Sequence, residues 1–313
     1  MRSIPVVDMR AFTHGDAASQ DNFVRRFGAG LAEFGFVTLD RHDVPAELIR
    51  RAFDVTARLF ALPPEALQRC VVPESKGNRG YVAFGRERAV GARLADLKEF
   101  WHVGQETIRP EHAAIYDRNV WPADAAVADF REVSLALYRA LESVALTSLR
   151  AVARYLQLPD AHFADMAIDG NSILRLIHYP PVPADVPAGA VRAAAHEDIN
   201  LLTLLVESTT GGLELQARDG AWIPVHSLAG QIVLDAGDML QRATNGMIPS
   251  TTHRVVNPSG PNVTRYSLPF FTHPRPEVVL APAATTVTPE RPARYEPITA
   301  QAFLEDRLRA ITA

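Results

Sequence analysis

Two histidines and one carboxylate in the second half of the chain have the types and order of a metal-binding set. His196 and Asp198 stand two positions apart, and His253 follows in a later segment. Two imidazoles and a carboxylate are the donors that hold a non-haem iron(II) on one face and leave its opposite face open. The set therefore indicates an iron(II) oxygenase that activates O2.

An arginine and a serine shortly after the third candidate ligand suggest a partner for that metal. Arg265 and Ser267 are two positions apart in a strand-like run, so their side chains should share one face of a strand. A guanidinium binds a carboxylate through two parallel hydrogen bonds, and a hydroxyl can add another. Alone, the pair is interpreted as a structural salt bridge with an incidental serine. After the three candidate ligands, it indicates an anchor for a dicarboxylate co-substrate.

The His-x-Asp pattern by itself is weak evidence. With 10 histidines and 36 acidic residues among 313, about one such match is expected by chance. A second match, His14-Gly15-Asp16, lies in a polar segment and is interpreted as a solvated turn. His196-x-Asp198 enters a predicted strand, where residues i and i+2 point to one face and can converge on one ion.

Composition excludes several other classes of protein. The net charge of −4 predicts neither nucleic acid nor an anionic membrane as a partner. No long apolar run or apolar N-terminal segment occurs, so we expect no membrane segment and a cytoplasmic location. The single cysteine, Cys70, excludes an internal disulfide and is assigned a structural role. Gly28-Ala29-Gly30 does not indicate a dinucleotide site, because Glu33 occupies the third small-residue position.

The elements that must position these residues change character along the chain. Up to residue 170 the pattern is mostly helical, with predicted helices at 22–35, 45–62 and 126–156. The same region contains short predicted strands at 4–9 and 36–39 and a polar loop at 74–93. Short β-branched runs then follow at 174–179, 201–206, 213–216, 222–225, 231–234, 250–257, 265–271 and 278–280.

Eight such runs indicate a double-sheet jelly roll. We therefore expect a mainly β fold with N-terminal helices, in which 1–313 forms a single compact unit. Its predicted parts are a mostly helical region at 1–170, a jelly-roll (double-stranded β-helix) core at 171–285, and a C-terminal tail and helix at 286–313.

Many short motifs resemble, in order, the isopenicillin N synthase-like family of 2-oxoglutarate/iron(II) oxygenases. The resemblance covers nearly the whole chain. The motifs are Ile4-Pro5-Val6-Val7-Asp8, Phe34-Gly35-Phe36, Gly80-Tyr81, Asp96-Leu97-Lys98-Glu99, Arg175 with Tyr179-Pro180-Pro181, His196-Glu197-Asp198, Gly211-Gly212-Leu213, Trp222-Ile223-Pro224-Val225, Gly237-Asp238, Thr244-Asn245-Gly246, His253-Arg254-Val255 and Arg265-Tyr266-Ser267.

The resemblance implies iron ligation by His196, Asp198 and His253. It also implies that Arg265 and Ser267 hold the distal carboxylate of 2-oxoglutarate. One departure concerns the segment before the first ligand. Many members have Asn-Tyr-Tyr-Pro there, whereas this chain has Ile177-His178-Tyr179-Pro180. Ile177 cannot replace the asparagine's hydrogen bond, Tyr179 remains a candidate co-substrate contact, and His178 either supplies a polar contact or faces outward.

The implied reaction couples O2 and the decarboxylation of 2-oxoglutarate to succinate with oxidation of a small-molecule substrate. The outcome is hydroxylation, desaturation or cyclisation, and the acidic ligand Asp198 argues against halogenation. Two other functions stay open: an iron oxidase that binds its substrate's own carboxylate at the arginine, and a catalytically silent jelly-roll binding protein. Neither the substrate nor the oligomeric state is indicated by the sequence.

The substrate pocket is expected to be built partly from the 75–106 segment. Its arginines either pair with a substrate carboxylate or are solvated loop charges. Its aromatic residues, with Phe271, either line an apolar pocket or belong to the core. The residues concerned are Arg86, Arg88, Arg93, Phe84, Phe100 and Trp101.

Overall fold

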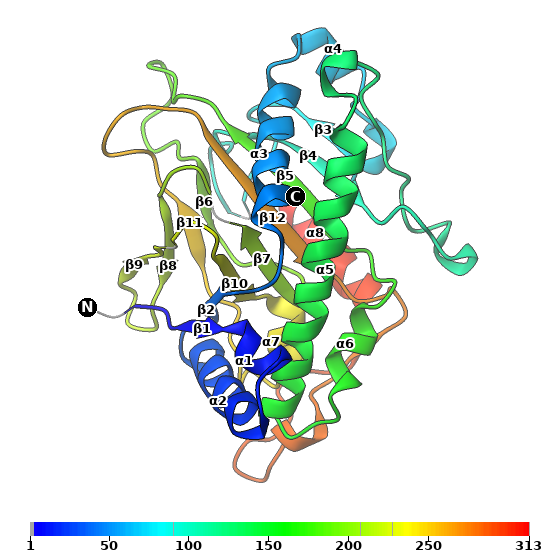
Figure 1. Cartoon of the computed structure of the whole chain (residues 1–313), viewed down its shortest axis with the longest axis vertical. Coiled ribbons are helices and arrows are strands. Elements are labelled where there is room, and N and C mark those ends of the chain that lie inside the picture. The colour runs from blue at the N-terminus through cyan, green and yellow to red at the C-terminus, as the bar shows by residue number, and fades with distance from the viewer. Residues whose placement is uncertain (1–2, 90, 207, 227, 313) are drawn as a thin grey trace.

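The protein is built from two facing β-sheets and a layer of helices outside the larger sheet (Figure 1). The computed structural model describes residues 3–89, 91–206, 208–226 and 228–312. The larger sheet has eight strands in the order β1-β2-β10-β7-β12-β5-β4-β3. Their bounds are β1 (Val6–Asp8), β2 (Phe36–Asp40), β10 (Ile232–Ala236), β7 (Leu202–Val206), β12 (Arg265–Thr272), β5 (Ile173–Tyr179), β4 (Glu99–Gly104) and β3 (Gly80–Val82).

The smaller sheet has four strands in the order β6-β11-β8-β9. They are β6 (Ala193–His196), β11 (His253–Val255), β8 (Leu213–Gln216) and β9 (Trp222–Pro224). An apolar cluster fills part of the space between the sheets. Its buried members are Ile4, Phe36, Ala193, Leu213, Leu215, Ile223, Val225, Val233 and Val255. Side chains alternate across each strand, so the other faces of β5, β7, β10 and β12 pack on the helices. The jelly roll with a helical layer is therefore confirmed.

The helical layer is organised around α5 (Phe130–Tyr155), which runs along one side of the molecule in Figure 1. It packs against α2 (Ala17–Phe34), α3 (Ala46–Phe60) and α6 (Ala161–Ala167). Asp16 caps α2 through a hydrogen bond from the Ser19 N–H, so the His14-Gly15-Asp16 match has a structural role. The remaining helices are α1 (Met9–Thr13), α4 (Pro64–Gln68), α7 (Asp238–Ala243) and α8 (Ala300–Thr312). None of the helices in the described residues is long and apolar enough to cross a membrane.

Three details differ from the sequence-based expectations. The segment predicted as a loop contains β3, and the unassigned β4 pairs with β3 and β5. Polar residues interrupt the apolar pattern of these strands in the sequence. In the fold, the Glu99 carboxylate on β4 accepts hydrogen bonds from Tyr81 and His178. The 278–280 run lies outside the jelly roll, since β13 (Val279–Leu280) pairs with β14 (Ile298–Thr299) in a separate two-stranded sheet.

Candidate metal centre

The two sheets bring His196, Asp198 and His253 together inside the jelly roll. His196 is the last residue of β6 and lies opposite His253 on β11. Nε2 of His196 is 3.7 Å from Oδ1 of Asp198, and Nε2 of His253 is 3.9 Å from the same oxygen. One candidate ligand atom from each residue lies within 4.8 Å of the others. This spacing allows all three to bind one ion.

The route by which Asp198 reaches the site differs from the prediction. His196 ends β6, so Asp198 lies in the following turn rather than on the same strand face. Its backbone carbonyl accepts a hydrogen bond of 2.8 Å from the N–H of Asp238 at the start of α7. The turn, held by α7, therefore directs the carboxylate towards the histidines.

Hydrogen bonds fix which atoms of the three side chains are free to bind a metal. Nδ1 of His196 lies 2.7 Å from the Ala194 carbonyl oxygen, and Nδ1 of His253 lies 3.1 Å from that of Thr251. A ring nitrogen beside a carbonyl must carry the proton, so each Nε2 presents its lone pair. Oδ2 of Asp198 accepts a hydrogen bond from the Thr203 hydroxyl, and Oδ1 faces the histidines. The donor set thus fits a divalent transition metal.

The protonation states also suit metal binding. Burial lowers the pKa of His196, and the neighbouring His253 lowers it further, so His196 is neutral near pH 7. Burial would raise the pKa of Asp198, but His253 and His196 outweigh that effect and lower it. At neutral pH the site therefore combines a neutral imidazole with an ionised carboxylate.

Replacing Thr203 with valine should weaken metal binding without removing a ligand. The change preserves shape but removes the hydrogen bond that orients the Asp198 carboxylate. Loss of such an outer partner typically lowers metal affinity by about 10- to 100-fold. Competition with a chromophoric chelator measures the change, and Thr147→Val, at a partly exposed threonine of α5, is the control. Equal affinity in wild type and Thr203→Val would show that Thr203 does not orient the ligand.

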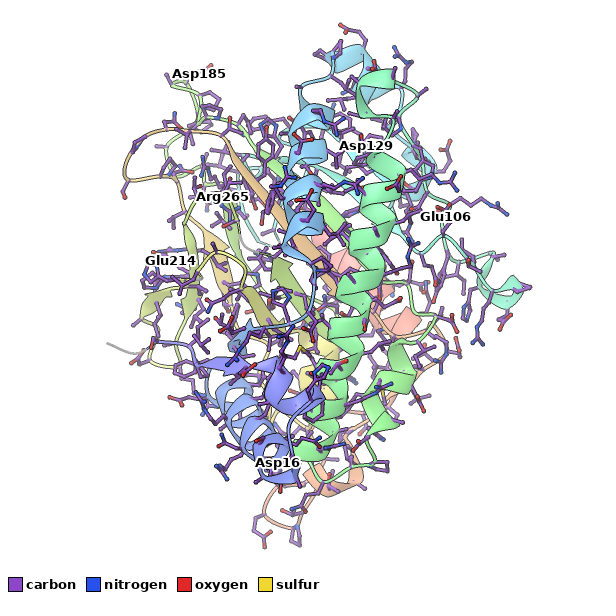
Figure 2. The ribbon with its side chains drawn as sticks, in the orientation of Figure 1. Asp16, Glu106, Asp129, Asp185, Glu214 and Arg265 are labelled. Carbon is purple, nitrogen blue, oxygen red and sulfur yellow. The ribbon has the colours of Figure 1, made fainter. Side chains whose placement is uncertain are left out.

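Arg265 lies at the other end of the same interior and is completely buried. Its Nε donates a 3.1 Å hydrogen bond to the Thr210 carbonyl oxygen, but Nη1 and Nη2 have no hydrogen-bond partner in the described part of the chain. Burial lowers the pKa of Arg265, although the nearby Tyr179 opposes this shift. In Figure 2 the Arg265 label lies within the outline of the molecule, whereas Asp185 lies at its upper edge. Two unpaired nitrogens on a buried guanidinium match the two oxygens of a carboxylate.

Strand register places the other predicted anchor residues beside Arg265. Arg265 is opposite Tyr179, and Ser267 is opposite Ile177, on the paired strands β12 and β5. The guanidinium carbon of Arg265 lies 4.7 Å from the centre of the Tyr179 ring. A second buried arginine, Arg192, lies 5.9 Å from that ring and donates a 2.6 Å hydrogen bond to the Val263 carbonyl oxygen. This end of the interior is therefore strongly cationic.

His178 lies on the opposite face of the sheet from the candidate site. Its Nδ1 is 2.7 Å from Oε1 of Glu99, and its ring stacks on Phe60 of α3 and on Tyr266. Ile177 faces the interior, where it packs with Phe100. Of the two alternatives for His178, the outward-facing one is therefore correct.

The residues considered for the substrate pocket separate into two groups. Arg86, Arg88, Arg93 and Phe84 are exposed, and Trp101 packs on Phe130 in the helical layer. Phe100 and Phe271 instead face the interior, where both contact the Arg175 guanidinium.

Several residues of the site were not found from the sequence. Thr203 interrupts an otherwise apolar strand, and that interruption was the available signal. Arg192 lies in an irregular segment before β6 and gave no sequence signal.

His273, just beyond β12, makes the stability of the metal-free protein depend on pH. Burial lowers the pKa of His273 to about 4; the Asp198 charge opposes this, and Arg79 adds to it. An unfolded histidine titrates near 6.5, so the unfolded chain binds more protons between these values. Stability should therefore be complete above pH 6.5 and fall by about 2–3 kcal/mol towards pH 4 from this group alone. Denaturant unfolding of His273→Gln should show a shallower fall, and an identical fall would assign the effect elsewhere.

Comparisons with known proteins agree with this geometry. Residues 4–124 match the family model described as the N-terminal region of non-haem dioxygenases in morphine synthesis. Residues 170–274 match the 2OG-Fe(II) oxygenase superfamily. The proline hydroxylase buaE of Petromyces alliaceus is 32% identical, with 96% of this chain and 97% of that protein covered. The 2-oxoglutarate-Fe(II) type oxidoreductase hxnY of Emericella nidulans is 31% identical, with 97% and 88% covered.

Solved structures show the same similarity. A putative 2OG-Fe(II) oxygenase family protein from Caulobacter crescentus is 40% identical, with a TM-score of 0.89 and coverage of 99% of this chain and 100% of that one. A full-length Neurospora crassa protein, solved in complex with alpha-KG and thymine, is 29% identical, with a TM-score of 0.89 and coverage of 98% and 96%.

Proposed function

The chain belongs to the 2-oxoglutarate/Fe(II) oxygenase family, and we propose specific roles for the residues of its site. The protein is a dioxygenase that uses Fe(II), 2-oxoglutarate and O2. His196, Asp198 and His253 hold the iron, and Arg265 with Ser267 holds the distal carboxylate of 2-oxoglutarate. The observation that carries these roles is the buried Arg265 guanidinium, whose two free nitrogens share one interior with the His-Asp-His set.

The surrounding residues position the reactants and exclude water. When bound, iron and 2-oxoglutarate supply the oxidative decarboxylation that provides the oxidising power. The Tyr179 ring lies against the Arg265 guanidinium and holds it in place. Nη1 and Nη2 of Arg265 thereby stay available to the co-substrate. Ile177 gives the co-substrate an apolar wall in place of an amide hydrogen bond. Asp198 would be the third protein ligand of the metal, and the remaining positions would be open to 2-oxoglutarate and O2.

The substrate is a small-molecule metabolite, and its oxidation is hydroxylation, desaturation or cyclisation. Support comes from two relatives: one is named a proline hydroxylase, and the other was crystallised with thymine. Both ligands are small rings. Residues 1–313 act as one unit, because β2 and β4 from the N-terminal 170 residues complete the sheet that carries Arg265.

A coupled assay tests this function. Iron(II)-loaded protein is supplied with O2 and 2-oxoglutarate, with L-proline and thymine as first trial substrates. Succinate should form in step with 2-oxoglutarate loss, and chelation of iron should stop both. O2 consumption without succinate would instead indicate an oxidase that binds its substrate's own carboxylate at Arg265.

A further inference from the structure

A cluster of buried and partly buried charges lies beside the metal centre and has no role in holding iron or 2-oxoglutarate. Nη1 and Nη2 of Arg175 on β5 lie 3.1 and 3.0 Å from the two carboxylate oxygens of Glu87. Nζ of Lys98 lies 2.7 Å from Glu87 and 2.8 Å from Asp96. Glu87 thus pairs with both cations, and Asp96 pairs with Lys98 as well.

Two aromatic rings and a histidine also contact the Arg175 guanidinium. Its carbon lies 4.2 Å from the centre of the Phe100 ring and 5.1 Å from that of Phe271. Its Nε donates a 2.6 Å hydrogen bond to Nε2 of His102, whose Nδ1 lies 2.7 Å from the Gly77 carbonyl oxygen. A planar fork fixed in this way is preorganised to bind a carboxylate through two hydrogen bonds.

The cluster is directly connected to the strand that carries the first iron ligand. Oδ1 of Asp96 accepts a 2.9 Å hydrogen bond from the Ala194 N–H, and the Ala194 carbonyl accepts one from His196. On β5, Arg175 occupies the same interior face as Ile177 and Tyr179, which border the co-substrate end. A group bound at Arg175 would therefore lie in the same interior as the metal.

The position of Glu87 allows its side chain to move away from Arg175 and Lys98. It belongs to the irregular segment between β3 and β4, whereas Arg175 is on a central strand. The Glu87 side chain is 27% exposed, against 17% for Arg175 and 5% for Lys98. Glu87 is therefore the most exposed of the three side chains, and its displacement would uncover both cations.

We propose that Arg175 anchors a carboxylate of the substrate, and that Glu87 occupies this anchor until the substrate's carboxylate displaces it. This inference rests on the proposed function. It predicts that the substrates of the enzyme are small carboxylic acids. Removal of Glu87 leaves Arg175 without a carboxylate partner and Lys98 with Asp96 alone, which is unfavourable unless another anion enters. A neutral molecule cannot make that exchange.

Carboxylate binding by the complete protein tests the proposal. Protein with iron(II) and saturating 2-oxoglutarate is held without O2, and its thermal midpoint is followed against propionate, benzoate and their amides. A ligand that binds the folded state raises the midpoint with concentration. We expect the acids, and not propionamide or benzamide, to raise it.

Variants distinguish a Glu87 that the ligand displaces from a Glu87 that stays paired with Arg175 as a structural ion pair. Glu87→Gln removes the competing charge and should tighten propionate binding by about tenfold or more. Arg175→Gln should abolish the effect, and Arg88→Gln, at an exposed arginine next to Glu87, is the matched control that leaves binding unchanged. A gain of affinity in Glu87→Gln cannot arise from misfolding.

Two results would overturn the inference. The first is propionate binding that is no tighter in Glu87→Gln than in wild type. The second is equal binding of acids and amides. Either would mean that Glu87 has only a structural role. The affinity for 2-oxoglutarate is measured first in each variant. If that affinity is normal, failure of the carboxylate tests concerns only Arg175 and Glu87. If wild type does not bind 2-oxoglutarate, the proposed function itself fails.

Discussion

His253→Ala is expected to abolish iron-dependent turnover while the protein remains folded. The change removes one of three donors, and the remaining two, His196 and Asp198, lie 3.7 Å apart at their nearest ligand atoms. His253 also packs its ring edge on Phe36, so a stability loss of about 1–3 kcal/mol is expected from truncation. Iron content after desalting and succinate formation should both fall to background.

The control for this variant is His14→Ala. His14 belongs to the other His-x-Asp match, lies on the surface, and precedes the Asp16 cap rather than a metal site. It should retain iron and full activity. Full activity in His253→Ala, measured at the same iron content, would remove His253 from the site.

Arg265→Ala is expected to raise the dissociation constant for 2-oxoglutarate by roughly 10- to 150-fold. The estimate corresponds to the loss of charge-assisted hydrogen bonds worth about 1.5–3 kcal/mol. Arg265→Lys should recover only part of the affinity, because an ammonium lacks the planar fork. Arg254→Ala is the control, since Arg254 pairs with Glu214 on the smaller sheet at 2.8 Å.

A stability measurement adds an independent check on Arg265. Among the described residues, Nη1 and Nη2 of Arg265 are buried without a hydrogen-bond partner, which is costly in the folded protein when no co-substrate is bound. The thermal midpoint of wild type should therefore rise with 2-oxoglutarate much more than that of Arg265→Ala. Equal increases in both proteins would mean that Arg265 serves another purpose.

The sequence predicted the jelly roll well where local patterns decide the structure. The runs at 213–216 and 265–271 have apolar residues at alternating positions. Leu213 and Leu215 are buried between the two sheets, and Leu268 and Phe270 pack in the cluster that faces the helices. β4 was not predicted, and it contains two polar residues, Glu99 and His102. Their hydrogen-bond partners, Arg175 and Tyr81, are distant in sequence and become neighbours only in the folded sheet.

The same limit applies to the site. The residue types and order indicated the metal set and the arginine anchor, because few side chains can perform that chemistry. The turn that delivers Asp198 depends on contacts with α7, and the ion pair between Glu87 and Arg175 depends on the course of a loop. Neither of these has a local sequence pattern.

The most direct test of the whole account is an anaerobic titration of the iron(II)-loaded protein with 2-oxoglutarate, followed by visible absorption. Chelation of the metal by a 2-oxo acid gives a weak metal-to-ligand charge-transfer band. We expect that band to appear and saturate in wild type, to need far more 2-oxoglutarate in Arg265→Ala, and to be absent in His253→Ala. The absence of a band in wild type with bound iron would contradict the account.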